Sequence, residues 1–383
     1  MRILYATDSY YPKIDGVVRY IDETSRLLSK NHEIGILAPS FGENPGTEYR
    51  NGLEINRLRS VDLAVHGYGF AFPHYGEAKK VVLRYDIVFV QSIAPLGSIA
   101  LFAAKHNRRP ILAFVHCLES VSMEAAFRQL FSPFRRLMDF YSQRLYMRCD
   151  RLLLESRTVA MELERLGIKN YERMLFGIDH ERFRRGMKSK FDFGLPDDKP
   201  IVLFAGRISY QKGVDILVQI IRNLSEEVHF LIVGDGPQRS FIEDLNVPNM
   251  TYVGGFLSNI EDAFASSDVF LFIGNEYRRD LTMICYEALA SGLPIVAPDF
   301  GYDTVLKDGY NSILCQRTPG SLTEGILRAI EEPLHTEMSV NASESVKDLT
   351  WPRYVERLER ILEETVEDFK RKRGFESPSS PSV

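Results

Sequence analysis

The sequence is poor in the motifs that mark several common classes of protein. Its four cysteines, Cys117, Cys149, Cys285 and Cys315, form no C-x-x-C pair, which argues against a zinc site or a thioredoxin-like redox site. Their apolar or helix-like surroundings predict free, buried thiols in a reducing compartment. The chain also has no G-x-x-x-x-G-K-[ST] loop, so it lacks the signature of a P-loop nucleotidase.

An excess of positive charge is also missing. The 383 residues carry a net charge of −5, which disfavours a generic nucleic-acid-binding protein. The charge is uneven, because residues 1–175 hold 24 Lys and Arg against 19 Asp and Glu, and the remainder holds 23 against 33. The basic N-terminal part is therefore expected to face an anionic partner.

Signals for export or membrane insertion are weak. The N-terminus lacks the charged region, apolar run and cleavage site of a signal peptide, so a cytoplasmic protein is expected. Residues 87–104 carry no charge and just reach the length of a membrane span. They contain Gln91, Pro95 and Gly97, which favour a strand, a turn and the start of a helix.

Short apolar runs alternate with helical patterns along most of the chain. Strands are expected at residues 3–6, 33–38, 86–90, 110–115, 151–154 and 173–176, and again at 201–205, 228–233, 268–273 and 294–297. Helices are expected at residues 17–29, 214–224 and 281–291. Continuous β-branched strands separated by helices predict parallel sheets covered on both faces. The restart at residue 201 predicts two consecutive doubly wound α/β domains.

The domain limits follow from this repetition. We expect an N-terminal Rossmann-like domain over residues 1–178 and a C-terminal one over 179–350. The polar segment 186–200, with its glycines and prolines, is the best linker candidate. A last helix over residues 351–373 is expected to pack back toward the N-terminal domain, and the Ser/Pro-rich tail 374–383 is expected to be disordered.

Ligands of doubly wound sheets bind at the carboxyl ends of the strands, which makes the loops there candidate sites. Gly16 lies at a helix start, where a backbone N–H could approach an anion. A turn glycine explains it equally well. His116 ends the expected strand 110–115 and is a second candidate, with a structural histidine as the alternative.

The loop that follows residues 201–205 carries two cations. Arg207 and Lys212 could converge on a diphosphate, one as a planar fork and the other as a point charge; a solvated pair is the alternative. Gly234 belongs to a G-D-G-P turn that lacks the third glycine of the dinucleotide fingerprint. This disfavours an NAD-dependent enzyme and predicts a tight turn beside a nucleotide.

Glu287 is a lone carboxylate in the apolar segment 281–291. Such a group is costly to bury without a partner. A sugar diol would suit it, and an ion pair with a nearby arginine is the alternative. The sequence contains no D-x-D, a spacing often used to hold a divalent metal on a nucleotide-sugar.

Taken in order, these motifs resemble the family 4 glycosyltransferases. The similarity rests on the opening D-S-Y-Y-P-K-I-D-G-V-V-R, the A-F-V-H before Cys117, and then G-R-x-x-x-x-K-G, V-G-D-G-P and Y-E-A-L-A-S-G-L-P. The resemblance implies a GT-B fold, with two Rossmann-like domains facing across a cleft. It also implies a retaining transferase that uses a nucleoside-diphosphate sugar without a bound metal or other cofactor. The opening is most similar to mannosyl- and glucosyltransferases that act on lipid or polyprenol-type acceptors.

The resemblance also assigns roles to residues. Arg207 and Lys212 would neutralise the leaving diphosphate, Glu287 would hold the ribose, and His116 would lie near the donor sugar. The full set expected to bind the donor is Gly16, Gly206, Arg207, Lys212, Gly234, Thr282, Met283 and Glu287. The base and the acceptor are not identified by these motifs.

One position departs from the family pattern. Arg279 stands where the family usually has a glutamate that touches the donor sugar, and Asp280 follows it. Three interpretations are open: Asp280 replaces the missing carboxylate, sugar recognition differs, or the protein is a non-catalytic GT-B protein that binds a nucleotide-sugar or supports a partner enzyme.

Residues 123–148 interleave five arginines, among them Arg135 and Arg136, with aromatic and aliphatic residues. Such a segment can lie in a membrane interface; an ordinary amphipathic helix is the alternative. The expected partners are therefore a nucleotide-sugar, a lipid-linked, phosphorylated or glycan acceptor, and an anionic surface on the inner face of the cell membrane. No nucleic acid is expected.

Overall fold

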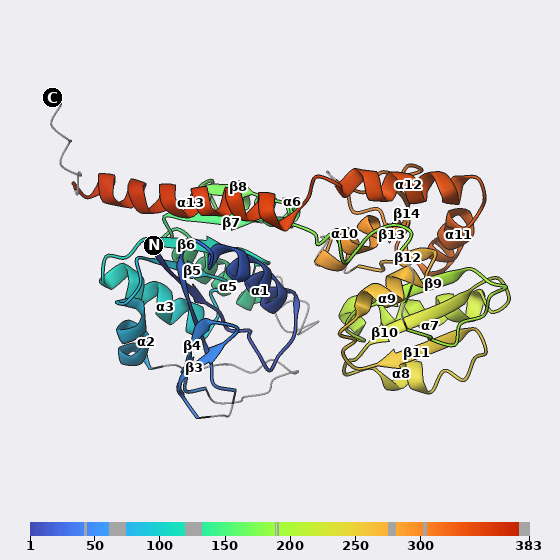
Figure 1. Ribbon diagram of the computed structural model, residues 1–383, viewed down its shortest axis with the longest axis horizontal. Helices are drawn as coiled ribbons and strands as arrows, with labels where there is room; N and C mark the ends of the chain where they lie inside the picture. The colour runs from blue at the N-terminus through green and yellow to red at the C-terminus, as the bar shows by residue number, and fades with distance from the viewer. Residues whose placement is uncertain are drawn as a thin grey trace. The chain divides into compact units, whose positions relative to one another are not determined.

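The computed structural model describes residues 1–41, 44–60, 74–118, 132–187, 189, 191–274, 281–301 and 305–374. Two compact units make up the chain (Figure 1). The first contains Met1–Leu175 together with the segment that begins at Trp351, and the second is Phe176–Thr350.

Residues 186–200, the expected linker, lie inside the second unit, so that expectation was wrong. Its described residues form a surface loop with local turns: Gly186 and Gly194 have φ values of +75° and +66°, and the Gly194 N–H donates to Asp192 at 2.8 Å. Glycine and proline here mark a turn-rich loop, which has the same composition as a linker.

The first unit is built on a sheet of eight strands in the order β3-β4-β2-β1-β5-β6-β7-β8. All neighbours are parallel except β3, which runs antiparallel to β4. The strands are β1 (Arg2–Ala6), β2 (Glu33–Pro39), β3 (Gly46–Arg50), β4 (Leu53–Leu58), β5 (Ile87–Val90), β6 (Ile111–Phe114), β7 (Arg151–Leu154) and β8 (Tyr171–Arg173). The helices are α1 (Gly16–Leu28), α2 (Tyr75–Val82), α3 (Pro95–His106), α5 (Ser132–Tyr146), α6 (Arg157–Arg165) and α13 (Trp351–Lys372).

The apolar runs form the central strands, as predicted. Every residue of β5 and β6 is buried, because parallel strands covered on both faces must be apolar throughout. Residues 87–104 form β5 and most of α3, also as predicted. The strand expected at 173–176 was misplaced: β8 is an edge strand of half-buried residues, so its apolar pattern is weak.

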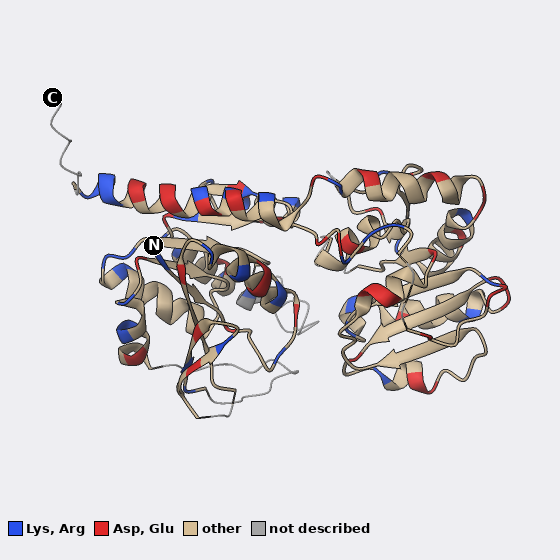
Figure 2. Ribbon diagram, viewed as in Figure 1, with Lys and Arg blue, Asp and Glu red and all other residues tan. Residues whose placement is uncertain are grey.

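Helix α13 belongs to the first unit and packs against α1 and β6. Its buried positions repeat every three or four residues, as in Trp351, Tyr354, Leu358 and Leu362, which is the pattern of a helix with one apolar face. Figure 2 shows acidic and basic residues interspersed along the helix. The apolar face therefore attaches the C-terminal helix to the N-terminal sheet.

The second unit has six parallel strands in the order β11-β10-β9-β12-β13-β14. They are β9 (Ile201–Ala205), β10 (His229–Gly234), β11 (Met250–Gly254), β12 (Val269–Leu271), β13 (Ile295–Pro298) and β14 (Ser312–Cys315). The helices are η1 (Tyr210–Lys212, one 3₁₀ turn), α7 (Val214–Asn223), α8 (Ser240–Glu243), α9 (Ile260–Ala265), α10 (Met283–Ala290), α11 (Pro319–Ala329) and α12 (Leu334–Val346).

This order is that of the dinucleotide-binding fold, with the switch point between β9 and β12. The corresponding switch point of the first unit lies between β1 and β5. Ligands of such sheets bind outside the carboxyl ends of these strands, which places the candidate site.

Two further expectations concern thiols and membrane spans. None of the four cysteines, all of which are described, forms a disulfide; Cys149 and Cys285 are buried and Cys117 and Cys315 half-buried. Among the described residues, no helix has the length and apolar character needed to cross a bilayer.

Candidate functional site

The loop after β9 carries the two cations predicted from the sequence. Gly206 leaves the strand with φ +149°, Arg207 is exposed, and Lys212 ends the 3₁₀ turn. Gly213 then adopts φ +78° and starts α7. The strand–loop–helix arrangement is therefore as expected, and one short loop at the switch point holds both Arg207 and Lys212.

The G-D-G turn after β10 supports this loop through close backbone contact. A Cβ on Gly234 would lie 1.9 Å from the carbonyl oxygen of Gly206, and one on Gly236 would lie 2.2 Å from that of Ile208. The Ile208 N–H donates to the Asp235 carbonyl at 2.9 Å. Only glycine fits such an approach, so both glycines shape the cationic loop.

The second cationic feature at this edge is the N-terminus of α10. Its first turn contains no acidic residue, and the Thr282 side chain makes no capping hydrogen bond. The helix begins at Met283, later than the expected residue 281. Helix N-termini attract anions through their N–H groups. Glu287 lies further along the helix and is only 3% exposed, as expected for a buried carboxylate.

Arg317 is a cation at this edge that sequence reasoning missed. It follows β14 closely, and its Nε donates to the carbonyl of Ile273, just past β12, at 3.2 Å. A Cβ on Gly213 would lie 3.3 Å from its guanidinium. Strand β14 was not predicted, so nothing in the sequence indicated that Arg317 lies at a strand's carboxyl end.

In the first unit, His116 lies just beyond β6. Its Nε2 is 3.2 Å from the Oε1 of Gln91, just beyond β5. The imidazole ring packs against the Phe114 ring in a tilted arrangement, with centroids 4.3 Å apart. It also forms a T-shaped contact with the Tyr20 ring, with centroids 5.5 Å apart. His116 is thus held in a defined orientation at the carboxyl edge.

Asp8 is another residue of this edge that the sequence did not single out. It accepts hydrogen bonds from the backbone of Leu96 at 2.8 Å and Gly97 at 3.0 Å, and from the Ser92 hydroxyl at 2.9 Å. Burial raises the pKa of Asp8, and these hydrogen bonds oppose the rise. Asp8 therefore caps α3 and ties the loops after β1 and β5 together.

Gly16 begins α1 in open space. No heavy atom lies within 4 Å of where its Cβ would be, and its φ is not positive. The neighbouring Asp15 caps the helix, accepting from Val17 at 2.9 Å and Val18 at 3.0 Å. Packing within the first unit does not require a glycine at position 16.

The predicted site residues therefore fall into two groups. Arg207, Lys212 and Glu287 lie in the second unit, with the loops that carry them, whereas Gly16 and His116 lie at the carboxyl edge of the first. Asp280, with its neighbour Arg279, lies outside the described residues.

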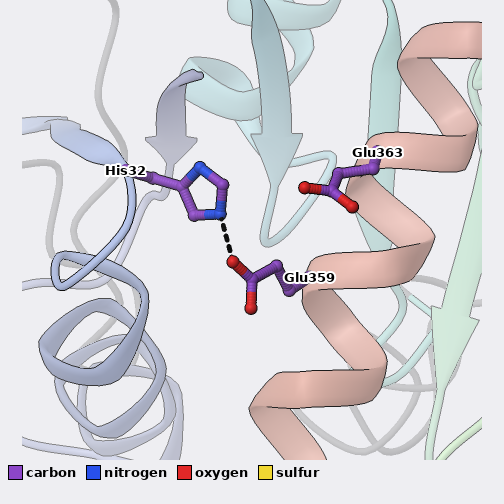
Figure 3. A group of neighbouring side chains, drawn as sticks. All are labelled: His32, Glu359 and Glu363. Atoms are coloured by element: carbon purple, nitrogen blue, oxygen red, sulfur yellow. Dashed lines mark hydrogen bonds and ion pairs between the residues drawn. The ribbon is translucent and has the colours of Figure 1, made fainter.

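The described part of the chain contains one group that could hold a metal ion, His32, Glu359 and Glu363 (Figure 3). His32 lies 2.7 Å from Glu359, which also accepts from Asn31 at 3.1 Å. His32 directly precedes β2, so the group lies at the amino end of the strands, opposite the candidate site. These hydrogen bonds attach α13 to the turn before β2.

The two arginines singled out in the expected membrane segment both lie on helix α5 but differ in exposure. Arg135 is half-buried and lies 3.8 Å from Glu162, whereas Arg136 is exposed. The exposed positions form one stripe: Arg136, Leu137, Phe140, Arg144 and, just past the helix, Met147. Leu137, Phe140 and Met147 are 57%, 53% and 63% exposed. An ordinary amphipathic helix would bury these apolar side chains.

Structures of known proteins share the fold. Sucrose-phosphate synthase from Thermosynechococcus elongatus matches with a TM-score of 0.75 and 17% identity, over 95% of this chain and 98% of that chain. HepE of Anabaena, in complex with UDP-glucose, matches with a TM-score of 0.72 and 18% identity, over 95% and 100%. With its two doubly wound units, the protein has the GT-B fold of glycosyltransferases.

Sequence comparison places it more narrowly. The model described as Glycosyltransferase Family 4 matches residues 14–182, and the one described as Glycosyl transferases group 1 matches residues 199–332. The chain belongs to the family 4 glycosyltransferases, as its motifs predicted.

The names of relatives agree with this assignment. A GDP-mannose-dependent alpha-mannosyltransferase of Corynebacterium glutamicum is 28% identical over 92% of this chain and 86% of its own. One of Mycobacterium tuberculosis is 28% identical over 79% and 80%. An alpha-monoglucosyldiacylglycerol synthase of Streptococcus pneumoniae is 25% identical over 78% and 71%.

Proposed function

We propose that this glycosyltransferase moves a hexose, mannose from GDP-mannose in the first instance, to a lipid-linked or phosphorylated acceptor with retention of the anomeric configuration. The observation that carries the proposal is the loop of Arg207 and Lys212 at the switch point of the second unit. The names of the mannosyltransferase relatives support the donor. The diacylglycerol in the name of another relative supports a lipid acceptor.

Transfer depends mainly on stabilising the negative charge that develops on the leaving diphosphate. The bond between the sugar's anomeric carbon and the diphosphate breaks, and negative charge grows on the departing phosphate. Arg207 and Lys212 stabilise that charge, and the amides at Thr282 and Met283 donate hydrogen bonds to it; such preorganised donors are a major source of catalysis. The acceptor oxygen forms the new bond, and its proton passes to the leaving phosphate.

The remaining residues bind and orient the donor. Glu287 accepts hydrogen bonds from the ribose hydroxyls, and Gly16 donates its N–H to the diphosphate. His116 lies beside the donor sugar, and Asp280 takes the place of the carboxylate that Arg279 displaces. No metal or other cofactor has a part in this scheme.

The acceptor side is proposed to rest on an anionic membrane surface. The exposed stripe of α5 supports this proposal, since Leu137 and Phe140 can enter the interface while Arg136 and Arg144 meet lipid phosphates. The ring of Phe140 lies 4.9 Å from the Arg144 guanidinium, so the charged and apolar groups form one surface.

A transfer assay on the purified full-length protein tests the function. GDP-mannose, UDP-glucose and ADP-glucose are each offered with vesicles that contain lipid acceptors, and donor consumption and product are followed. We expect GDP-mannose to be consumed, with an α-linked mannolipid identified by NMR. A β-linked product would contradict retention, and consumption of another donor alone would contradict GDP-mannose.

A further inference from the structure

Gln91 is a buried amide at the switch point of the first unit. It directly follows β5, and its backbone N–H donates to the Ala6 carbonyl of β1 at 2.8 Å. Its side chain is 1% exposed. A buried amide without full hydrogen bonding is costly, so its presence in this apolar strand end requires an explanation.

The amide has two polar atoms, and His116 is the described partner of one of them. Gln91 Oε1 lies 3.2 Å from His116 Nε2, and β5 and β6 are neighbouring parallel strands. The other atom, Gln91 Nε2, has no hydrogen-bond partner among the described residues. Among the described residues, the side-chain amide therefore has its polar contact with the histidine.

The chemistry of the pair follows from its atoms. When Gln91 Oε1 accepts, the proton of the imidazole must be on Nε2, which leaves Nδ1 as the acceptor of the ring. An amide has no charge, so it orients the ring without stabilising an imidazolium as a carboxylate partner would. A neutral histidine suits a site where positive charge grows on a sugar.

We propose that Gln91 is a positioning residue for His116, which it holds in one orientation and as the neutral Nε2–H tautomer. The inference rests on the proposed function of His116 beside the donor sugar. Phe114 and Tyr20 restrict the plane of the ring, and the Gln91 carbonyl favours the proton on Nε2.

NMR tests the tautomer without any substrate. Long-range ¹H–¹⁵N correlation spectra of the full chain separate the ring nitrogens of each histidine, and loss of one set in His116→Asn assigns His116. We expect the Nε2–H pattern in the unaltered protein and an averaged, mixed-tautomer pattern in Gln91→Leu. An unchanged His116 pattern in Gln91→Leu would overturn the proposal.

Gln91→Glu provides a second test that keeps the shape of the side chain. Tyr20, whose pKa burial raises, packs its ring against His116; Tyr354, whose pKa burial also raises, lies against Tyr20, and Glu155 interacts with Tyr354. These are the same in both proteins. The new carboxylate should therefore raise the midpoint of His116 titration by about 1 unit or more. An unchanged midpoint would contradict direct contact.

Kinetics then separate positioning from general destabilisation. Gln91→Leu should lower kcat about tenfold or more, as loss of an orienting partner does at other sites, with the donor KM within about twofold. Gln143→Leu is the matched control, since it removes an amide that donates to the Leu166 backbone at 2.6 Å in the same unit, and it should leave kcat unchanged. If the unaltered enzyme transfers no sugar, the proposed function fails. The NMR result would still test whether Gln91 sets the tautomer of His116.

Discussion

The hydroxyls of Tyr20 and Tyr354 lie 3.0 Å apart in the interior of the first unit and join its first helix to its last. The Tyr20 ring also forms a T-shaped contact with His116, and the Trp351 ring lies 6.3 Å from the Tyr20 ring. The point where the chain returns from the second unit is thus connected to His116 through one tyrosine. Helix α13 therefore supports the candidate site of a sheet whose strands lie far away in the sequence.

Tyr354→Phe should lower the free energy of unfolding by about 0.5–1.5 kcal/mol, the net value of one buried hydrogen bond. Thermal or urea unfolding measures the change. Tyr171→Phe is the control, because the Tyr171 hydroxyl donates to Glu164 at an exposed position and should matter little. Equal losses of unfolding free energy in the two variants would show that the buried Tyr20–Tyr354 hydrogen bond stabilises the protein no more than an exposed one.

Arg207→Ala and Lys212→Ala should each reduce turnover by roughly 10²–10³-fold, the cost of losing one preorganised donor to developing charge. Initial rates at saturating donor measure the loss. Arg222→Ala removes an exposed arginine of α7 and should keep the rate of the unaltered enzyme. Nearly unaltered rates in both site variants would refute the role assigned to the cationic loop.

This loop illustrates what a sequence can predict. The short apolar run 201–205, followed closely by a glycine, predicts a buried strand and a turn, so Arg207 and Lys212 could be placed on a loop without coordinates. Strand β3 could not be predicted, because all five of its residues are exposed and it has no apolar face. The linker was misjudged for a related reason, since a turn-rich loop and a linker have the same composition.

Contacts between neighbouring strands were harder to foresee. Gln91 and His116 are far apart in sequence, and only the order of β5 and β6 brings them together. Asp8 is similar, because its partners Leu96 and Gly97 belong to the helix after another strand. Gln91, His116 and Asp8 each lie just past an expected strand, so their place at the carboxyl edge of the sheet was predictable. Their partners were not, because they depend on the order of the strands, which local patterns do not encode.

Activity should survive excess EDTA. The sequence has no D-x-D, and the described group that could hold a metal lies at the amino end of the first sheet, away from the carboxyl edge. Rates are compared before and after chelation in metal-free buffer. Loss of activity that Mg²⁺ or Mn²⁺ restores would contradict metal-independent transfer.

Gly16→Ala should weaken donor binding without weakening the fold. Its Cβ would meet no atom within 4 Å, and alanine at a compatible position stabilises by about 0.4–1 kcal/mol. The backbone N–H stays, but the added Cβ would stand between it and the diphosphate; a hydrogen bond to a charged group contributes about 1.5–3 kcal/mol, so the donor KM should rise about tenfold or more. Unfolding curves and donor titrations measure the two effects, and an unchanged KM would remove Gly16 from the donor site.

Gly234→Ala provides the opposite case. Its Cβ would lie 1.9 Å from the Gly206 carbonyl oxygen, at a φ of +141°. We expect a loss of stability of about 1–3 kcal/mol from backbone strain, together with weaker donor binding because the cationic loop is displaced. Full stability in this variant would show that the two loops do not depend on each other's close approach.

Exchange of Arg136 and Arg144 for glutamate should detach the protein from anionic vesicles. A basic residue near such a surface contributes about 1 kcal/mol, so reversing two should reduce partitioning by roughly 30-fold or more. Both side chains are exposed on one stripe of α5 with Leu137 and Phe140, so the fold should be unaffected. Arg135 is left in place because it lies 3.8 Å from Glu162, and its loss would disturb the helix itself.

Arg222→Glu with Lys307→Glu changes the net charge equally at exposed positions of the second unit and should leave binding intact. Co-sedimentation at two salt concentrations measures the effect, which should shrink as salt screens the charges. Equal sedimentation of the two double variants, both below that of the unaltered protein, would show that net charge, and not this stripe, decides membrane contact.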